Sequence, residues 1–138
     1  MRTGEDHRHV RHRHLDELAQ ATVLQRPISL DTGNGELFGS LLLPKSDAPV
    51  PVVLILAGSG PTDRDGNNPD GGRNDSLKRL AWVLAKHNIA SVRYDKRGVA
   101  ASRAATPDEK DLRVERYVAD VEGWAKLLRA APRFNRLI

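Results

Sequence analysis

The residues best placed to do chemistry lie in a loop that follows an apolar run at residues 52–57. Unbroken runs of valine, isoleucine and leucine are typical of buried parallel strands, and in open α/β sheets ligands bind just beyond the carboxyl ends of such strands. The loop opens with a glycine-rich turn formed by Gly58, Ser59 and Gly60. It continues with three charged residues, Asp63, Arg64 and Asp65. The pattern predicts a ligand site in this loop.

Nucleotides and calcium are both disfavoured as ligands, because the loop lacks the residues that each would need at the contact positions. A dinucleotide fingerprint needs glycine at the sixth position, which is Asp63 here, and a P-loop needs a Gly-Lys-Ser/Thr ending that the loop lacks. A calcium loop that starts at Asp63 needs glycine and glutamate where this chain has Asn68 and Asn74. Two interpretations remain. The polar side chains cap turns through Asx hydrogen bonds, or the glycines shape an oxyanion hole.

An oxyanion hole needs backbone N–H groups that point at the negative charge of a tetrahedral intermediate. Glycines allow the backbone to turn these groups toward a substrate because they carry no Cβ. In the α/β-hydrolase architecture, one donor comes from a loop after the third strand and the other from the residue that follows the nucleophile.

The elements before the loop are predicted to be extended. Residues 27–32 and 36–43 form a hairpin, because Asn34 and Gly35 between them both accept positive φ. Residues 44–51 are expected to be a linker, since they contain too many prolines for a central strand.

Two helices and two strands are predicted after the loop. Apolar residues in 76–87 recur at helical spacing, with Asn74 or Asp75 to cap the start and Asn88 to end the helix. Residues 90–94 read as a strand. A second helix follows, which Thr106, Pro107 and Glu109 are expected to cap. Its predicted apolar stripe consists of Val114, Tyr117, Val118, Val121, Ala125 and Leu128. A last strand begins at residue 134. The order predicts an α/β fold, with an antiparallel hairpin before a parallel sheet with crossover helices.

The composition excludes several function classes. The chain of 138 residues has room for one domain, and it has no cysteine for disulfides, thiolate zinc sites or cysteine nucleophiles. A net charge of +4 is spread along the chain and only 4% of residues are aromatic, which argues against nucleic acid as a partner. No apolar run is long enough for a membrane span, and the N-terminus has no signal-peptide pattern. We expect a cytoplasmic location and no membrane partner.

Residues 1–22 form a separate zone in which four histidines alternate with arginines. Histidine tracts can bind metal, but the arginines repel a cation and no cysteine or convincing carboxylate set completes a site. We expect a flexible tail at 1–22, followed by an incomplete domain at 23–138, with no metal and no cofactor.

Four segments together resemble a known family. They are residues 57–67 (AGSGPTDRDGN), 74–78 (NDSLK), 93–102 (RYDKRGVAAS) and 111–120 (DLRVERYVAD). In this order they resemble the N-terminal half of α/β-hydrolase esterases of the EstD-like group, related to the serine aminopeptidases of family S33. The resemblance covers about residues 27–138 and implies a carboxylic-ester (acyl) hydrolase lineage that acts on small-molecule esters.

The resemblance implies roles for the residues of the loop. Ser59 and Gly60 fall where this fold supplies the first backbone oxyanion donor, and Gly58 permits the turn. Asp63, Arg64 and Asp65 would lie beside the acyl pocket, where they bind substrate or brace the loop. A further set matches the turn after the fourth strand and is usually structural: Asp95, Arg97 and Gly98. Ala100 stands where relatives often have a second glycine, so that turn is expected to be tighter or displaced.

The departure from the family is an absent G-x-S-x-G nucleophile elbow, with its later acid and histidine. Ser59 and Ser102 sit on no such elbow, and His87 is expected at a helix end, so these residues do not suggest a rearranged triad. We therefore expect a fragment of an enzyme that is inactive by itself. The strand from residue 134 should pair with residues 52–57 and leave an open edge. That edge is a hazard for self-association. The alternative is a non-catalytic interaction module that pairs through this edge.

Overall fold

The predicted hairpin is the first element of the computed structural model, which describes residues 23–58, 60–105 and 114–138. Strand β1 (Val23–Asp31) pairs antiparallel with β2 (Glu36–Pro44) along its whole length. The hairpin is confirmed, but positive φ occurs at Gly33 and Gly35, whereas Asn34 does not adopt it. The Asn34 side chain instead accepts a hydrogen bond from the Thr32 hydroxyl at 2.9 Å.

Within the described residues, the remaining strands join the hairpin in one mixed sheet of five strands, and the helices lie between them along the chain. In chain order they are β3 (Val50–Ile55), α2 (Ser76–Lys86), β4 (Ala90–Tyr94), the short helix η1 (Ala100–Ala105), α3 (Val114–Arg129) and β5 (Phe134–Leu137). The strand order is β1-β2-β4-β3-β5, and β3 lies parallel to both of its neighbours. The predicted fold class and the pairing of the last strand with β3 are confirmed.

The predicted linker at residues 44–51 is wrong at both ends. Pro44 is the last residue of β2 and lies opposite Val23, whereas Pro51 lies inside β3. The ladder between β3 and β5 shifts register between Val50 and Pro51. A proline is tolerated at such an irregularity because no regular ladder hydrogen bond requires its missing N–H.

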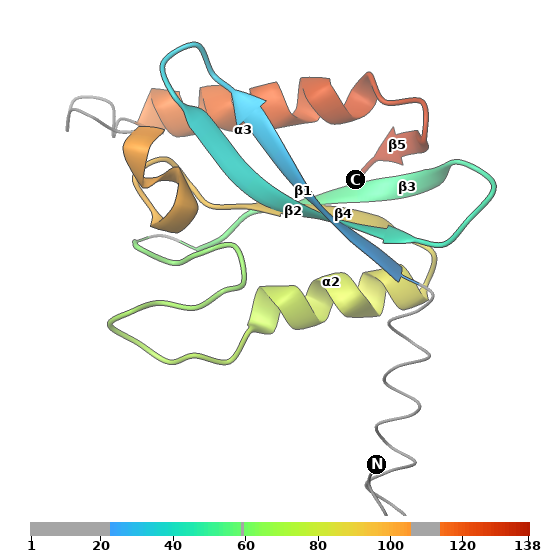
Figure 1. Ribbon diagram of the computed structural model, residues 1–138, viewed down its shortest axis with the longest axis horizontal. Coiled ribbons are helices and arrows are strands. Elements are labelled where there is room, and N and C mark those ends of the chain that lie inside the picture. The colour runs from blue at the N-terminus through green and yellow to red at the C-terminus, as the bar shows by residue number, and fades with distance from the viewer. Residues whose placement is uncertain (1–22, 59, 106–113) are drawn as a thin grey trace, which may run out of the picture.

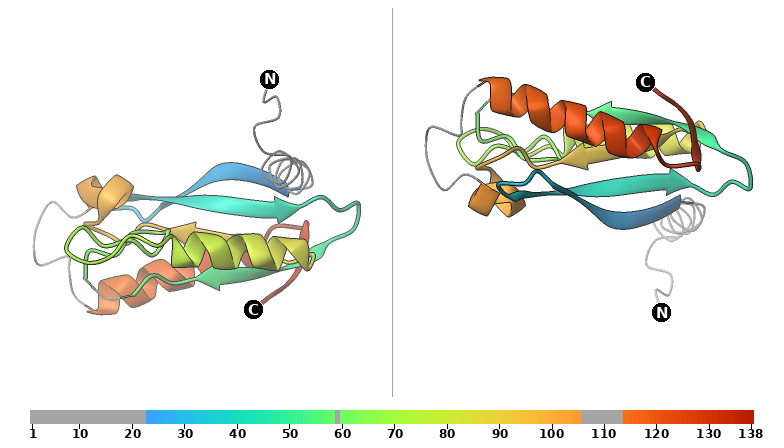
Figure 2. Two further views of the ribbon diagram at one scale, coloured as in Figure 1. Left: turned by 90° about the horizontal axis from the view of Figure 1, so that it is seen from below. Right: turned by 90° about the horizontal axis from the view of Figure 1, so that it is seen from above.

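The two helices cover opposite faces of the sheet (Figures 1 and 2). The chain runs from β3 through α2 to β4 on one side, then returns through α3 to β5 on the other side of β3. The carboxyl end of β3 is therefore a topological switch point, where α/β sheets leave a crevice for ligands. Among the helices of the described residues, none is long and apolar enough to cross a bilayer.

Each face of the sheet has its own hydrophobic core. On the α2 side, Leu42 and Ile55 pack against Ala81 and Ala85. On the α3 side, a larger cluster surrounds Trp124, whose ring centroid lies 5.1 Å from that of Tyr94. Burial of these apolar faces is what holds the helices on the sheet.

The predicted apolar stripe of α3 is partly wrong. Val114 and Val118 are 74% and 50% exposed, whereas Asp120 and Trp124 are buried. The buried face is rotated from the predicted stripe because it includes Asp120, whose carboxylate pairs with the buried Arg97 at 2.8 Å. A charged residue in the core is invisible to hydrophobic periodicity. The residues predicted to cap this helix, at 106–109, lie outside the described residues.

The buried Tyr94 predicts a loss of stability at alkaline pH. Burial, with a contribution from the charge of Asp120, raises the pKa of Tyr94 to about 12. Since the unfolded pKa is about 10, the stabilisation is complete below pH 10 and is lost as pH rises toward 12. We expect the free energy of unfolding to fall by ~2 kcal/mol more between pH 10 and 12 than in Tyr94→Phe, as measured by urea titration. Parallel pH profiles for the two proteins would contradict the prediction.

Candidate functional site

The predicted site lies at the carboxyl end of β3, where the loop of residues 56–75 leaves the sheet. This loop and η1 lie at the same end of the sheet (Figure 1). Gly60 adopts a φ of +77°, which favours glycine, and a Cβ added at Gly58 would meet no other atom within 4 Å. Ser59 lies outside the described residues. Gly58 and Gly60 thus follow β3 at the carboxyl end of the strand, as the sequence predicted.

Asp63 stabilises the next turn, at residues 63–67, through hydrogen bonds of its side chain and its backbone. Its Oδ1 accepts the amides of Asp65 and Asn67, each at 2.9 Å. The Asp63 amide donates to the Asn67 carbonyl at 2.9 Å, and the Gly66 amide donates to the Asp63 carbonyl at 3.1 Å. This is the Asx-type capping that the sequence allowed.

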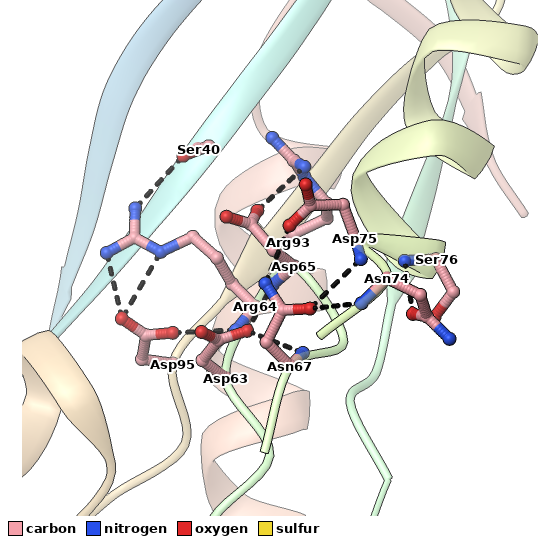
Figure 3. Close-up of polar contacts among 10 residues, drawn as sticks. All are labelled: Ser40, Asp63, Arg64, Asp65, Asn67, Asn74, Asp75, Ser76, Arg93 and Asp95. Atoms are coloured by element: carbon pink, nitrogen blue, oxygen red, sulfur yellow. Dashed lines mark hydrogen bonds and ion pairs between the residues drawn. The ribbon is translucent and has the colours of Figure 1, made fainter. Parts of the chain in front are cut away.

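Arg64 ties the loop to the buried carboxylate of Asp95 (Figure 3). Its Nη2 and Nε donate to Asp95 Oδ2 at 2.9 and 3.2 Å, and its backbone amide donates to Oδ1 at 2.7 Å. The remaining Nη1 reaches the Ser40 hydroxyl on β2 at 3.0 Å. One side chain therefore connects the loop with β2 and with the residue that follows β4.

Asp65 forms the second ion pair of the loop, with Arg93 on β4. The Nη1 of Arg93 donates to Asp65 Oδ1 at 3.0 Å (Figure 3), and the arginine is buried whereas the Asp65 side chain is 33% exposed. Burial lowers the pKa of Arg93, while the negative charge of Asp65 acts in the opposite direction. Asp63, Arg64 and Asp65 thus all brace the loop in this structure. Their contact with a substrate stays a prediction.

Asn67 fixes the junction between the loop and α2. Its Oδ1 accepts the amides of Asn74 and Asp75 at 3.0 and 2.9 Å, and its Nδ2 donates to the Asp75 carboxylate at 2.6 Å (Figure 3). This hydrogen bond lowers the pKa of Asp75. Of the two predicted caps, Asn74 accepts the amide of Ser76 at 3.0 Å, whereas the Asp75 side chain makes no capping bond.

Sequence reasoning missed Lys96, whose side chain forms hydrogen bonds with the glycine turn. The ammonium donates to the carbonyl oxygen of Gly60 at 2.8 Å and also to that of Gly58. Burial lowers the pKa of this lysine. The only available signal was the position of Lys96 in the segment RYDKRG, without any indication of its partner.

The turn after β4 is built from buried charges. The guanidinium of Arg97 is 1% exposed, pairs with Asp120 through two nitrogens, and also donates to Asn34 and to the carbonyl of Ala105. Ala100 adopts a φ of +46°, a left-handed conformation that favours glycine and costs this alanine some strain. These contacts agree with the expectation that Asp95, Arg97 and Gly98 have a structural role.

The structure separates the residues that a rearranged triad would need. Ser102 is buried, and its hydroxyl accepts the amide of Phe38 at 3.0 Å. His87 ends α2 at the opposite end of the sheet from η1 (Figure 1). Within the ranges that the structure describes, no group of three His, Cys, Asp or Glu side chains could share a metal ion, and the histidine tract falls outside these ranges.

Comparison with known proteins identifies the architecture. No protein-family model matches the chain. Esterase EstD of Thermotoga maritima is 39% identical over 66 residues, which span 48% of this chain and 15% of the esterase. An α/β serine hydrolase without lid from Xanthomonas campestris is 26% identical, with a TM-score of 0.57 over 82% of this chain and 48% of that one. The fold is that of the α/β hydrolases. The resemblance inferred from the sequence is confirmed.

Two further α/β-hydrolase structures have the same fold. A cold-adapted esterase from an Arctic intertidal metagenomic library gives a TM-score of 0.62 at 15% identity, over 83% of this chain and 49% of that one. A dienelactone hydrolase-like promiscuous phosphotriesterase from metagenomic libraries gives 0.59 at 15% identity, over 84% and 47%. The chain therefore spans about half the length of these structures and a smaller part of the curated esterase.

The Lys96 contact predicts that Lys96→Met loosens the glycine turn while the sheet stays folded. Loss of the hydrogen bonds from a charged donor should raise amide hydrogen exchange in residues 56–62 by roughly tenfold. Mass spectrometry of the exchanged peptides measures this change. The matched control is Lys86→Met, since Lys86 lies exposed in the last turn of α2. Equal exchange in the two variants would contradict a role for Lys96 in holding the turn.

Proposed function

We propose that the chain forms the oxyanion side of a carboxylic-ester hydrolase of the α/β-hydrolase type. The observation that carries the proposal is the position of the glycine turn at the switch point of the sheet, with its carbonyls turned to Lys96. An ester carbonyl bound there would become negatively charged when a nucleophile attacks it. A backbone N–H group of the turn, from Ser59 or Gly60, would stabilise that charge.

In this proposal the residues of the loop divide their roles. Ser59 and Gly60 supply the backbone donor, and Gly58 leaves room for the acyl group. Asp63, Arg64 and Asp65 border the acyl pocket and keep the turn rigid through the contacts with Asp95 and Arg93. A preorganised donor stabilises the transition state most because it does not need to reorient during the reaction.

The nucleophile is proposed to come from polypeptide other than residues 1–138. In the α/β-hydrolase mechanism a serine on a G-x-S-x-G elbow attacks the ester, and a histidine oriented by an acid takes its proton. The printed sequence has no such elbow. A small-molecule ester would therefore be hydrolysed only where this chain and the nucleophile-bearing segment fold together.

The proposal predicts that residues 1–138 alone do not hydrolyse p-nitrophenyl acetate and are not labelled by a fluorophosphonate probe. Turnover that a fluorophosphonate abolishes would overturn the division of the site. The coding sequence after Ile138 provides the complementary observation. A G-x-S-x-G motif there, in phase or after a frameshift, would support the proposed lineage, whereas an unrelated fold in the continuous chain would overturn it.

The open edge of β5 favours a second candidate, a module that binds another polypeptide by strand addition. β5 is the last strand in the sheet order, and Ile138, which directly follows it, is 57% exposed. An exposed strand edge can accept a strand from a partner or from a second copy. Size-exclusion chromatography with light scattering tests this candidate. A complex of defined mass supports it, and polydisperse aggregate argues against it.

A further inference from the structure

A pocket of about 490 Å³ lies between the loop that follows the glycine turn and the turn after β4. One wall belongs to the loop and includes Pro61, Asn68 and Arg73, and the other includes Val99 and Arg103. Pro61 directly follows Gly60, so the pocket begins beside the proposed oxyanion turn. It also lies beyond the carboxyl ends of β3 and β4, where α/β sheets bind ligands.

The pocket contains two cations and one acid. Arg73 and Arg103 stand on opposite walls and are exposed, and neither guanidinium has a hydrogen-bond or ion-pair partner within the described residues. The acid is Asp63, whose Oδ1 already accepts two backbone amides. The charge of Arg73 also reaches Asp75, but Asp75 is hydrogen-bonded to Asn67 and does not line the pocket. The charge available to a ligand is therefore positive.

The rest of the lining is largely apolar. Pro61, Pro69, Val99 and Ala100 offer carbon surface between the two arginines. A guanidinium binds carboxylate or phosphate oxygens through paired N–H groups, which a lysine cannot do in the same way. A ligand that fits both features has a short hydrocarbon segment and a terminal anionic group.

We propose that this pocket is an anion subsite, in which Arg73 and Arg103 bind a carboxylate or phosphate group carried by a small ester. This proposal rests on the proposed hydrolase function, which it deepens by naming the substrate class as esters that carry an anionic group. The ester carbonyl would lie at the glycine turn, and the anionic end of the same molecule would lie between the two arginines. A neutral ester of equal length would leave both guanidinium groups without a partner.

Binding to the intact chain tests the proposal without any turnover. Monomethyl succinate is titrated into ¹⁵N-labelled protein, with dimethyl succinate as the neutral control and inorganic phosphate as a separate arm. We expect saturable shifts of the Gly71, Gly98 and Val99 amides with monomethyl succinate but not with dimethyl succinate. Saturation by phosphate alone would keep the anion site and assign it to phosphoryl groups. Absence of saturable shifts with both anions overturns the proposal.

Two double variants with the same change of net charge give the matched control. Arg73→Gln/Arg103→Gln should weaken binding of the anion by at least about tenfold, because each paired guanidinium contributes a charge-assisted hydrogen bond. Arg79→Gln/Arg129→Gln alters exposed arginines that do not line the pocket and should leave the affinity unchanged. Equal weakening in both would show non-specific charge attraction and overturn the subsite. Since no turnover is measured, this failure is distinguishable from failure of the hydrolase proposal.

Discussion

The candidate site depends on the buried carboxylate of Asp95. It accepts hydrogen bonds from the backbone and guanidinium of Arg64 and from the amide of Ala101, so one side chain joins the loop after β3, the end of β4 and η1. Arg64 extends the connection to Ser40 on β2. A buried carboxylate without its partner costs several kcal/mol, which favours the loop conformation that keeps Arg64 on Asp95.

Buried residues of alternating charge lie at the end of β4 and in the turn that follows it. Arg93, Asp95 and Arg97 each pair with a residue from another segment, and the partners come from the loop and from α3. Such pairs add little net stability, because desolvation offsets most of the attraction. Their effect here is geometric, since each pair permits one arrangement of the segments. Lys96 bonds the glycine turn directly, and the pairs of Arg64 with Asp95 and of Asp65 with Arg93 hold the loop that follows it.

Local patterns in the sequence predicted most of the fold, while the contacts that shape the site are non-local. The hairpin, α2 and β4 follow from turn residues and periodicity within short windows. Periodicity failed where a charged residue entered the core, as at Asp120, and the proline rule failed where a ladder irregularity admitted Pro51. The glycine turn was visible in the sequence. The partners of Lys96 and Arg64 were not, because they lie 24 to 38 residues away and no local rule relates them.

The pairing of β3 with β5 also affects the order in which the sheet can assemble during synthesis. The Asn135 side chain bonds the Pro49 carbonyl, 86 residues earlier in the chain. At about 5–20 residues per second, β3 waits roughly 4–17 s for this neighbour, whereas the β1–β2 hairpin can close almost as soon as it emerges. During that interval one edge of an apolar strand is available to nascent-chain chaperones. The same arrangement that creates a crevice at the end of β3 thus delays completion of this part of the sheet until β5 has been made.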